Sequence, residues 1–207
     1  MKTNQPLEEK IVQTALKMFN ENGIEYVGMR ELAAALGIRI GNLNYYFPTK
    51  DDLVNRLSLL LAEENSKIIV PIDDMTMPLF LDMLSRVFEN HLKYRCLMLS
   101  FVHIMQRNPL IAKRYNKTQS ERSDTWSKNV QALVAKKLLN ADKEEIACLV
   151  STISLIARFW ISEAVVSFRK ESEDEQARHY LRMVARIILP YSTTKGRRYL
   201  EDYLAQI

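Results

Sequence analysis

The sequence predicts an all-α protein of nine or ten helices, and three observations support this fold class. The six prolines fall between stretches of helical periodicity, and none lies between Leu110 and Leu189, which leaves room for long helices. No run of alternating apolar and polar residues is bounded by turn dipeptides, so the usual sign of a β-strand is missing. Helix-start signatures, in contrast, recur along the chain.

The expected helices follow from apolar periodicity, from capping residues and from glycine or proline breaks. Their approximate ranges are 7–22, 29–36, 40–47, 50–67, 79–94, 97–106, 109–138, 142–170, 172–189 and 194–206. Four start signals support these bounds: Thr49 with Asp52, Asn108 before Pro109, Asp142 with Glu145, and Ser172 with Glu175.

Composition places the chain among ordinary globular proteins of a reducing compartment. There are two cysteines, Cys96 and Cys148, without a C-x-x-C pair, and the first ten residues lack the apolar core of a signal peptide. The uncharged stretch 146–157 is too short to span a bilayer. A net charge of +4 is compatible with a polyanionic partner but does not identify one. We therefore expect a cytoplasmic protein without a membrane span.

The stretch "MRELAAALGIRIGNLNYYF" predicts two short helices packed around a small core. Its apolar residues have the spacing such a core needs: Leu32, Leu36, Ile38, Leu43 and Phe47. Ala33 is small where the helices would cross. Gly37 stands where the chain leaves the first helix, and a left-handed backbone there favours glycine. The pattern is a helix-turn-helix.

Polar residues between these apolar positions face outward: Arg39, Asn42, Asn44, Tyr45 and Tyr46. They could simply solvate a surface, but two adjacent exposed tyrosines favour a ligand. Asparagine hydrogen-bonds base edges, and a tyrosine hydroxyl reaches phosphate oxygens. Lys50 adds a cation at the start of the next helix, whose free amides favour an anion. This surface would suit DNA.

The segment "GIRIGNLNYYFPTKDDL" resembles the signature of the tetracycline-repressor (TetR/AcrR) family. The matching residues are Gly37, Ile38, Gly41, Leu43, Tyr46, Phe47, Lys50 and Leu53. The likeness covers about residues 8 to 62. It implies an N-terminal helix-turn-helix DNA-binding domain over residues 1–50, a connecting helix over about 50–67, and a ligand-binding and dimerisation domain over 68–207. A change near residue 68, from short helices to longer ones rich in methionine and aromatic residues, agrees with this division.

Carried over by residue, the resemblance implies that Gly41 lets the backbone approach bases and that Asn42 contacts a base or phosphate beside it. Tyr45, Tyr46 and Lys50 resemble phosphate contacts. Three positions depart from the family pattern: Ile40 replaces a lysine, Asn44 a tyrosine, and Gly28 a threonine or serine cap. Ile40 could contact a thymine methyl group and Asn44 a base edge. The expected DNA-binding residues are Arg39, Ile40, Gly41, Asn42, Asn44, Tyr45, Tyr46 and Lys50.

The C-terminal half suggests a homodimer. The helix that contains residues 146–168 is apolar on nearly every side, so it needs cover beyond its own bundle, although a monomeric core helix is the alternative. The expected interface residues are Ile153, Ile156, Trp160, Leu181, Val184 and Ile188.

An effector pocket is also expected in the same half, and the alternative is that the same residues form an ordinary packed core. The expected lining is Phe88, His91, Phe101, His103, Met105, Trp126 and Phe159. Such a lining favours an apolar or aromatic compound.

The sequence argues against an enzyme. Its three histidines are scattered, no Cys/His set has metal-ligand spacing, and neither a glycine-rich phosphate loop nor a G-x-S-x-G elbow occurs. We expect no catalytic residues, metal or cofactor. The predicted function is sequence-specific, DNA-binding regulation of transcription. The regulator is expected to be a ligand-responsive repressor that binds a palindromic operator as a homodimer. The alternative is a helical adaptor whose C-terminal domain binds a protein.

Overall fold

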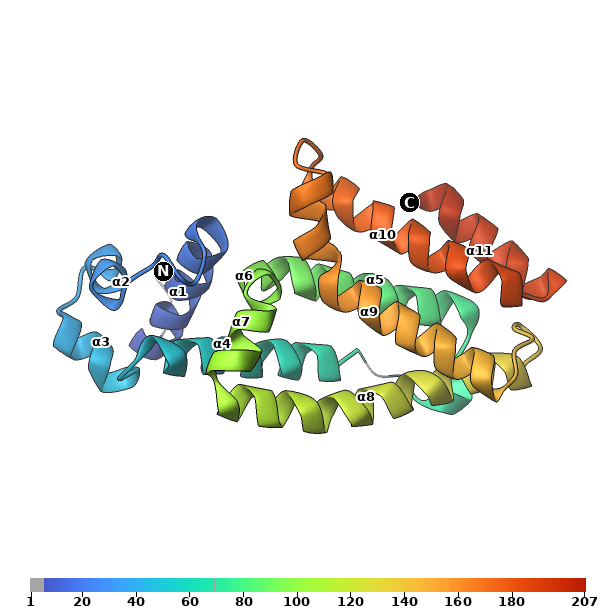
Figure 1. Ribbon diagram of the computed structural model, residues 1–207, viewed down its shortest axis with the longest axis horizontal. Helices are drawn as coiled ribbons and strands as arrows, with labels where there is room; N and C mark the ends of the chain where they lie inside the picture. The colour runs from blue at the N-terminus through green and yellow to red at the C-terminus, as the bar shows by residue number, and fades with distance from the viewer. Residues whose placement is uncertain (1–5, 69) are drawn as a thin grey trace. The chain divides into compact units, whose positions relative to one another are not determined.

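The computed structural model describes residues 6–68 and 70–207, which form helices and their connections (Figure 1). Within these residues there are eleven α-helices and two 3₁₀ helices. The first seven α-helices are α1 (Leu7–Asn22), α2 (Met29–Leu36), α3 (Ile40–Tyr46), α4 (Lys50–Ser66), α5 (Met77–Lys93), α6 (Arg95–Leu99) and α7 (Phe101–Arg107). The others are α8 (Pro109–Ala135), α9 (Lys143–Ser167), α10 (Glu173–Ile188) and α11 (Thr194–Gln206), with 3₁₀ helices η1 (Ile72–Asp74) and η2 (Leu189–Tyr191). The all-α prediction is confirmed.

One helix more than predicted is present because Ser100 divides the expected 97–106 helix. Its backbone at φ −90° and ψ 11° departs from helical values, so α6 ends at Leu99 and α7 begins at Phe101. The α8 helix also ends earlier than expected, at Ala135. Two residues later Lys137 has φ 56°, a left-handed conformation that stops a helix.

All four predicted helix starts are confirmed by hydrogen bonds. At α9, the Asp142 carboxylate accepts from the Glu145 amide at 2.9 Å, and the Glu145 carboxylate accepts from the Asp142 amide at 2.8 Å. At α4, the Thr49 amide and hydroxyl both donate to one oxygen of Asp52. Asn108 and Ser172 accept from the amides three residues ahead, at 3.1 and 3.2 Å. These side chains satisfy amides that the first helical turn leaves free.

The chain divides into two compact units. The described residues of the first unit fall within Met1–Glu64 and Lys93–Lys113, and those of the second within Asn65–Leu92 and Arg114–Ile207. Expectation from sequence placed α6 and α7 with the larger domain, whereas the contacts group them with the N-terminal helices.

Asn20 links two segments of the first unit that lie far apart in the sequence. Its side-chain amide donates to the Lys93 carbonyl at 2.9 Å, and its oxygen accepts from the Cys96 amide at 3.0 Å, which joins α1 to the start of α6. Glu64 accepts from the Lys93 ammonium at 2.7 Å and from the Tyr94 hydroxyl at 3.1 Å. The apolar core of this unit includes Ile11, Ala15, Phe19, Leu32, Leu43, Leu53 and Leu57.

In the second unit α9 and α10 pack along each other, and α11 packs on α10. Its core includes Phe80, Phe88, Val130, Leu133, Trp160, Val184 and Ile188. Helix α11 is also held by the backbone between α8 and α9, because the Thr193 amide donates to the Leu138 carbonyl at 3.1 Å. A Cβ atom on Gly196 would lie only 1.9 Å from that carbonyl oxygen. The first turn of α11 therefore approaches this loop as closely as glycine allows.

Candidate nucleic-acid interface

A well-packed scaffold supports the segment that the sequence singled out. In α2, Leu32, Ala33 and Leu36 are buried, and in and after α3, Leu43 and Phe47 are buried against the same small core. Helix α3 presents one apolar side chain in seven residues to this core, because its other residues point elsewhere. The predicted helix-turn-helix is present.

The turn between α2 and α3 depends on Gly37. Its backbone is left-handed, with φ 67° and ψ 29°, which glycine adopts without steric penalty. The Gly37 amide donates to the Ala34 carbonyl, and the Ile38 amide donates to the Ala33 carbonyl, both at 3.0 Å. These bonds satisfy carbonyls that the end of α2 would otherwise leave open, so the direction of α3 is fixed.

Seven of the eight residues expected to contact DNA lie in α3 or at its N-cap: Arg39, Ile40, Gly41, Asn42, Asn44, Tyr45 and Tyr46. All seven are exposed. Tyr45 is 83% exposed, and its ring meets that of Tyr46 edge-on with 5.2 Å between centroids. A large aromatic side chain left in water is the informative exception to ordinary burial. Two of them beside two asparagines form a surface suited to a ligand with phosphates and base edges.

Gly41 is the residue on this face for which the fold gives no reason. A Cβ atom placed on it would meet nothing within 4 Å, and its backbone has no left-handed φ. Glycine inside a helix destabilises it by about 0.5–1 kcal/mol relative to alanine. The lack of a side chain at Gly41 is therefore best explained by a binding partner that approaches the α3 backbone closely.

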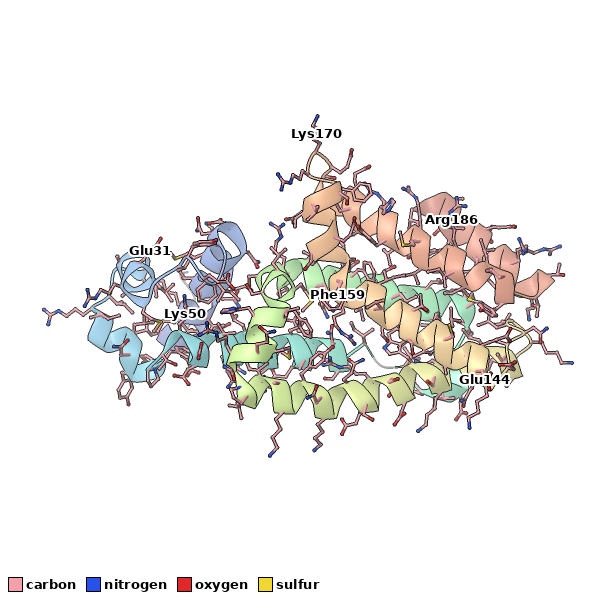
Figure 2. All side chains as sticks on the ribbon, in the orientation of Figure 1. Glu31, Lys50, Glu144, Phe159, Lys170 and Arg186 are labelled. Carbon is pink, nitrogen blue, oxygen red and sulfur yellow. The ribbon has the colours of Figure 1, made fainter. Side chains whose placement is uncertain are left out.

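Lys50 has partners other than the phosphate expected from the sequence. Its ammonium donates to the carbonyls of Ile24, Glu25 and Val27 at 2.8, 3.2 and 3.2 Å. An ammonium has three N–H groups, so these carbonyls can use all of them. In Figure 2 the Lys50 side chain lies among the helices of the first unit. Lys50 therefore holds the loop between α1 and α2 in place, just before α2 begins.

Two features of α2 were not singled out as site residues from the sequence. Arg30, the second residue of α2, is exposed and carries a charge suited to phosphate. The Glu31 carboxylate accepts from the Gly28 amide at 3.4 Å and partly replaces the missing threonine or serine cap. The signal for Arg30 was available, because the first helix of a helix-turn-helix crosses the DNA backbone.

The residues expected to line an effector pocket fall in both units. In the first unit, Phe101 and Met105 are half-buried and His103 is exposed. His103 is one of twelve residues around a pocket of about 490 Å³ between the end of α1, the α1–α2 loop, α6 and α7. The second unit holds the rest: Phe88 and His91, which are buried, and Trp126 and Phe159, which are half-buried.

Phe88 contacts two other rings of the second unit. It stacks on Trp160 with 5.0 Å between centroids and on His91 with 6.4 Å. Burial and the neighbouring charge of Arg122 lower the pKa of His91 to about 4, so its ring is neutral at physiological pH. Trp126 contacts Phe80 edge-on at 5.4 Å.

Five of the six residues expected at a dimer interface are already covered within one subunit: Ile153, Trp160, Leu181, Val184 and Ile188. The sixth, Ile156, is half-buried. The apolar side chains that the same two helices leave in water are Leu155 at 55%, Val166 at 69% and Met183 at 38% exposure. Leu155 and Val166 are three helical turns apart and share one side of α9. The sequence showed that α9 is apolar all round but could not show which side the subunit itself covers.

Helix α9 is also the one helix among residues 6–68 and 70–207 that is long and apolar enough to cross a membrane by length and composition. A core helix of a soluble protein meets the same test. Seven of its side chains are buried in the fold, whereas Leu155 and Val166 are exposed. The rest of α9 therefore has apolar surface to spare.

Comparison with known proteins gives consistent matches over both units. A family profile described as "Bacterial regulatory proteins, tetR family" matches residues 11–57, and the TetR profile described as "Bacterial transcriptional repressor" matches residues 61–200. The curated protein "Probable HTH-type transcriptional regulator YttP" of Bacillus subtilis (strain 168) is 29% identical over 62 residues. That match covers 30% of this chain and 30% of the relative's length.

Solved structures share the fold at low sequence identity. A TetR-family transcriptional regulator from Marinobacter aquaeolei VT8 superposes with a TM-score of 0.90 at 18% identity, over 98% of each chain. A transcriptional regulator from Saccharomonospora viridis in complex with choline gives 0.63 at 18% identity, over 84% of this chain and 93% of that one. The ketosteroid regulator KstR2 of Mycobacterium tuberculosis gives 0.65 at 14% identity, over 93% and 97%.

Proposed function

The chain belongs to the TetR family of bacterial transcriptional regulators, and from this premise we propose that it is a homodimeric repressor that a small molecule releases from its operator. DNA binding and transcription regulation come with the family, whose members are transcription factors and not enzymes. The repressor role, the dimer, the effector and a cytoplasmic location are the parts proposed here.

The observation that carries the proposal is the outward face of α3. Seven exposed residues with base- and phosphate-binding chemistry stand on a buried and hydrogen-bonded support. Asn42 and Asn44 supply amides for base edges, and Gly41 lets the helix approach them closely. Tyr45, Tyr46, Arg39 and the newly considered Arg30 supply contacts to phosphates. Lys50 supports this arrangement through the loop that precedes α2.

The proposed dimer uses the sides of α9 and α10 that one subunit leaves open, around Leu155, Val166 and Met183. A second copy is the occupant we propose because α9 keeps apolar surface that its own bundle does not cover. Two copies related by a twofold axis present two α3 helices, which can enter successive major grooves of a palindromic site. The interface residues predicted from the sequence, such as Ile153 and Val184, would lie in the core beneath this surface.

Release by an effector requires two arrangements of the protein that bind the effector with different affinity. Asn20 offers a physical link on the DNA side, because it joins α1 to the start of α6 through two hydrogen bonds. A shift of α6 would pull on α1 and hence on the support of α2 and α3. The regulator from Saccharomonospora viridis was solved with choline, so a ligand is compatible with this fold.

Selection of bound sequences from random duplex DNA tests the function. The wild type should enrich a palindromic sequence, and Asn44→Ala should change the preferred bases at the same positions of both half-sites. Asn116→Ala, an exposed asparagine of α8, is the matched control and should leave the preference unchanged. If the wild type enriches no sequence, the proposal fails, and the helical adaptor becomes the better hypothesis. If Asn44→Ala enriches the wild-type sequence, Asn44 does not read bases.

A further inference from the structure

Five buried side-chain polar atoms of the second unit have no hydrogen-bond partner among the described residues, and two of them are Nδ2 and Oδ1 of Asn129 in α8. The other three belong to aromatic rings: His91 Nδ1 of α5, Trp160 Nε1 of α9 and the Tyr180 hydroxyl of α10. Their side chains are 8%, 2% and 4% exposed. Leaving such an atom buried and unpaired costs about 1–3 kcal/mol each. Native cores contain few of these atoms, so a cluster of three needs an explanation.

The three ring atoms belong to side chains linked through Phe88 and Trp160. Phe88 lies nearly parallel to Trp160, with 5.0 Å between centroids and an angle of 11°, and stacks on His91 at 6.4 Å. The Tyr180 ring is 5.7 Å from that of Trp160. The three rings thus belong to one row of contacting aromatic side chains, His91–Phe88–Trp160–Tyr180, that α5, α9 and α10 build together.

Arg122 of α8 brings a positive charge close to His91, and the Glu121 carboxylate acts on it electrostatically without forming an ion pair. Arg122 acts electrostatically on His91, and its half-buried guanidinium makes no hydrogen bond or ion pair with another described residue. Burial lowers the pKa of this guanidinium, because removing the charged form from water is unfavourable. Nearby, Arg158 of α9 donates to the Tyr115 hydroxyl at 2.8 Å, and no described carboxylate pairs with it either. Two arginines, neither of them in an ion pair with a described carboxylate, therefore lie in this part of the bundle.

We infer that this region receives the effector, and that the effector is a small organic acid with a second polar group on an apolar or aromatic frame. The anionic group pairs with Arg122, because a guanidinium provides a planar set of donors for a carboxylate. The frame packs against Phe88 and the neighbouring rings. The second polar group reaches the unpaired atoms of Trp160, Tyr180 or His91. The inference rests on the proposed function, since it names the chemistry of the molecule that releases DNA.

Other ligand chemistries fit less well. A cation would meet the like charge of Arg122, and a neutral compound would leave the guanidinium unpaired in a partly desolvated place. The neutral His91 ring already interacts with the Ala157 backbone, so its free Nδ1 suits a hydroxyl donor on the ligand. Hydroxy acids satisfy both requirements.

The test is calorimetric titration of the full-length protein with matched pairs of compounds. The panel contains mandelate, 3-phenyllactate, 4-hydroxyphenylacetate, salicylate and 3-hydroxydecanoate, each beside its neutral amide. At least one acid should bind about tenfold or more tightly than its amide. That preference should disappear in Arg122→Gln and return in Arg122→Lys. Arg86→Gln, which removes an exposed arginine of α5, is the control and should keep it.

Two results would overturn the inference: no acid of the panel binds better than its amide, or the preference persists in Arg122→Gln. Thermal unfolding of each variant shows whether it is folded, and Arg122→Lys covers the case in which Arg122→Gln is not. DNA affinity without ligand is measured on the same preparations. If the wild type binds DNA selectively but prefers no acid, this inference fails alone. If the wild type selects no DNA sequence, the proposed function fails, regardless of which compounds bind to the second unit.

Discussion

In the first unit the polar side chains of α3 are exposed to water, above a buried apolar core and a hydrogen-bonded α2–α3 turn. In the second unit the order is reversed, because the surface of α9 includes large apolar side chains while polar atoms of His91, Trp160 and Tyr180 are buried without partners. The first unit places its polar groups on the surface, where a large, rigid ligand such as DNA could reach them. The second is incomplete in two directions, outward toward another copy and inward toward a small molecule.

The largest effect should come from the outward-facing apolar side of α9. The double variant Leu155→Arg/Val166→Arg should be monomeric, because burying charges at an interface costs several kcal/mol. Losing one of two half-site contacts should weaken operator binding about 1,000-fold, which corresponds to about 4 kcal/mol. Sedimentation and fluorescence anisotropy measure the two effects. Ile72→Arg, an equally apolar exposed residue of η1, should change neither. If the wild type sedimented as a monomer of 24.1 kDa, the proposal that α9 faces a second copy would be wrong.

The next effect concerns the buried polar atoms. The pKa of His91 is lowered to about 4 from 6.5, so the unfolded chain takes up this proton first as the pH falls. The contribution of a neutral His91 is present above pH 6.5 and is lost between pH 6.5 and 4, by about 3 kcal/mol. Urea unfolding of the wild type and of His91→Phe should therefore differ in slope against pH across this window. His103→Gln, an exposed histidine, is the control. Parallel slopes for wild type and His91→Phe would contradict the buried, neutral ring.

A smaller effect sharpens the account of the first unit. Lys50→Met should lower the free energy of unfolding by about 2 kcal/mol, because three loop carbonyls lose their charged donor. DNA binding should weaken as a consequence of the displaced loop. Lys17→Met, on the exposed side of α1, should have no such effect. If stability stayed unchanged while the salt dependence of DNA binding fell by about one unit, Lys50 would be a phosphate contact.

The smallest effect comes from adding a single methyl group at Gly41, which should change stability and DNA affinity in opposite directions. Gly41→Ala should stabilise the protein by up to about 1 kcal/mol, because alanine favours helix and a Cβ there meets nothing. Operator affinity should nevertheless fall about tenfold, or 1.4 kcal/mol. Gly28→Ala also has open space around it but lies outside α3, and should leave affinity within about twofold. An unchanged affinity of Gly41→Ala would show that the α3 backbone does not approach bases closely.

Much of the fold was predictable because its signals are local. Two helix starts are each signalled within four residues, by Thr49 with Asp52 and by Asp142 with Glu145. The turn between α2 and α3 is signalled by a single residue, Gly37. Ser100 carried no such mark, since serine occurs both in helices and between them, and the break there was missed.

The site was predictable only where exposure follows from periodicity. The residues of α3 fall outside the apolar spacing of Leu43 and Phe47, so their exposure could be inferred. Lys50 could not be resolved in the same way, because its partners lie 23 to 26 residues earlier in the chain. For α9, periodicity could not distinguish the side that faces the bundle from the side that faces water, since both are apolar. The unpaired atoms of Trp160 and Tyr180 depend on tertiary packing and leave no trace in the sequence pattern.

The contact between Gly196 and the Leu138 carbonyl has a consequence for how this sequence can vary. Position 196 lies in an otherwise polar stretch of a terminal helix, where a hydropathy profile would suggest free substitution. Because any side chain there would overlap a backbone oxygen that also accepts from Thr193, the neighbouring loop cannot move aside without giving up that hydrogen bond. In a scan of all single substitutions, position 196 should be as intolerant as the leucines of the interior, and alanine should be nearly as harmful there as tryptophan.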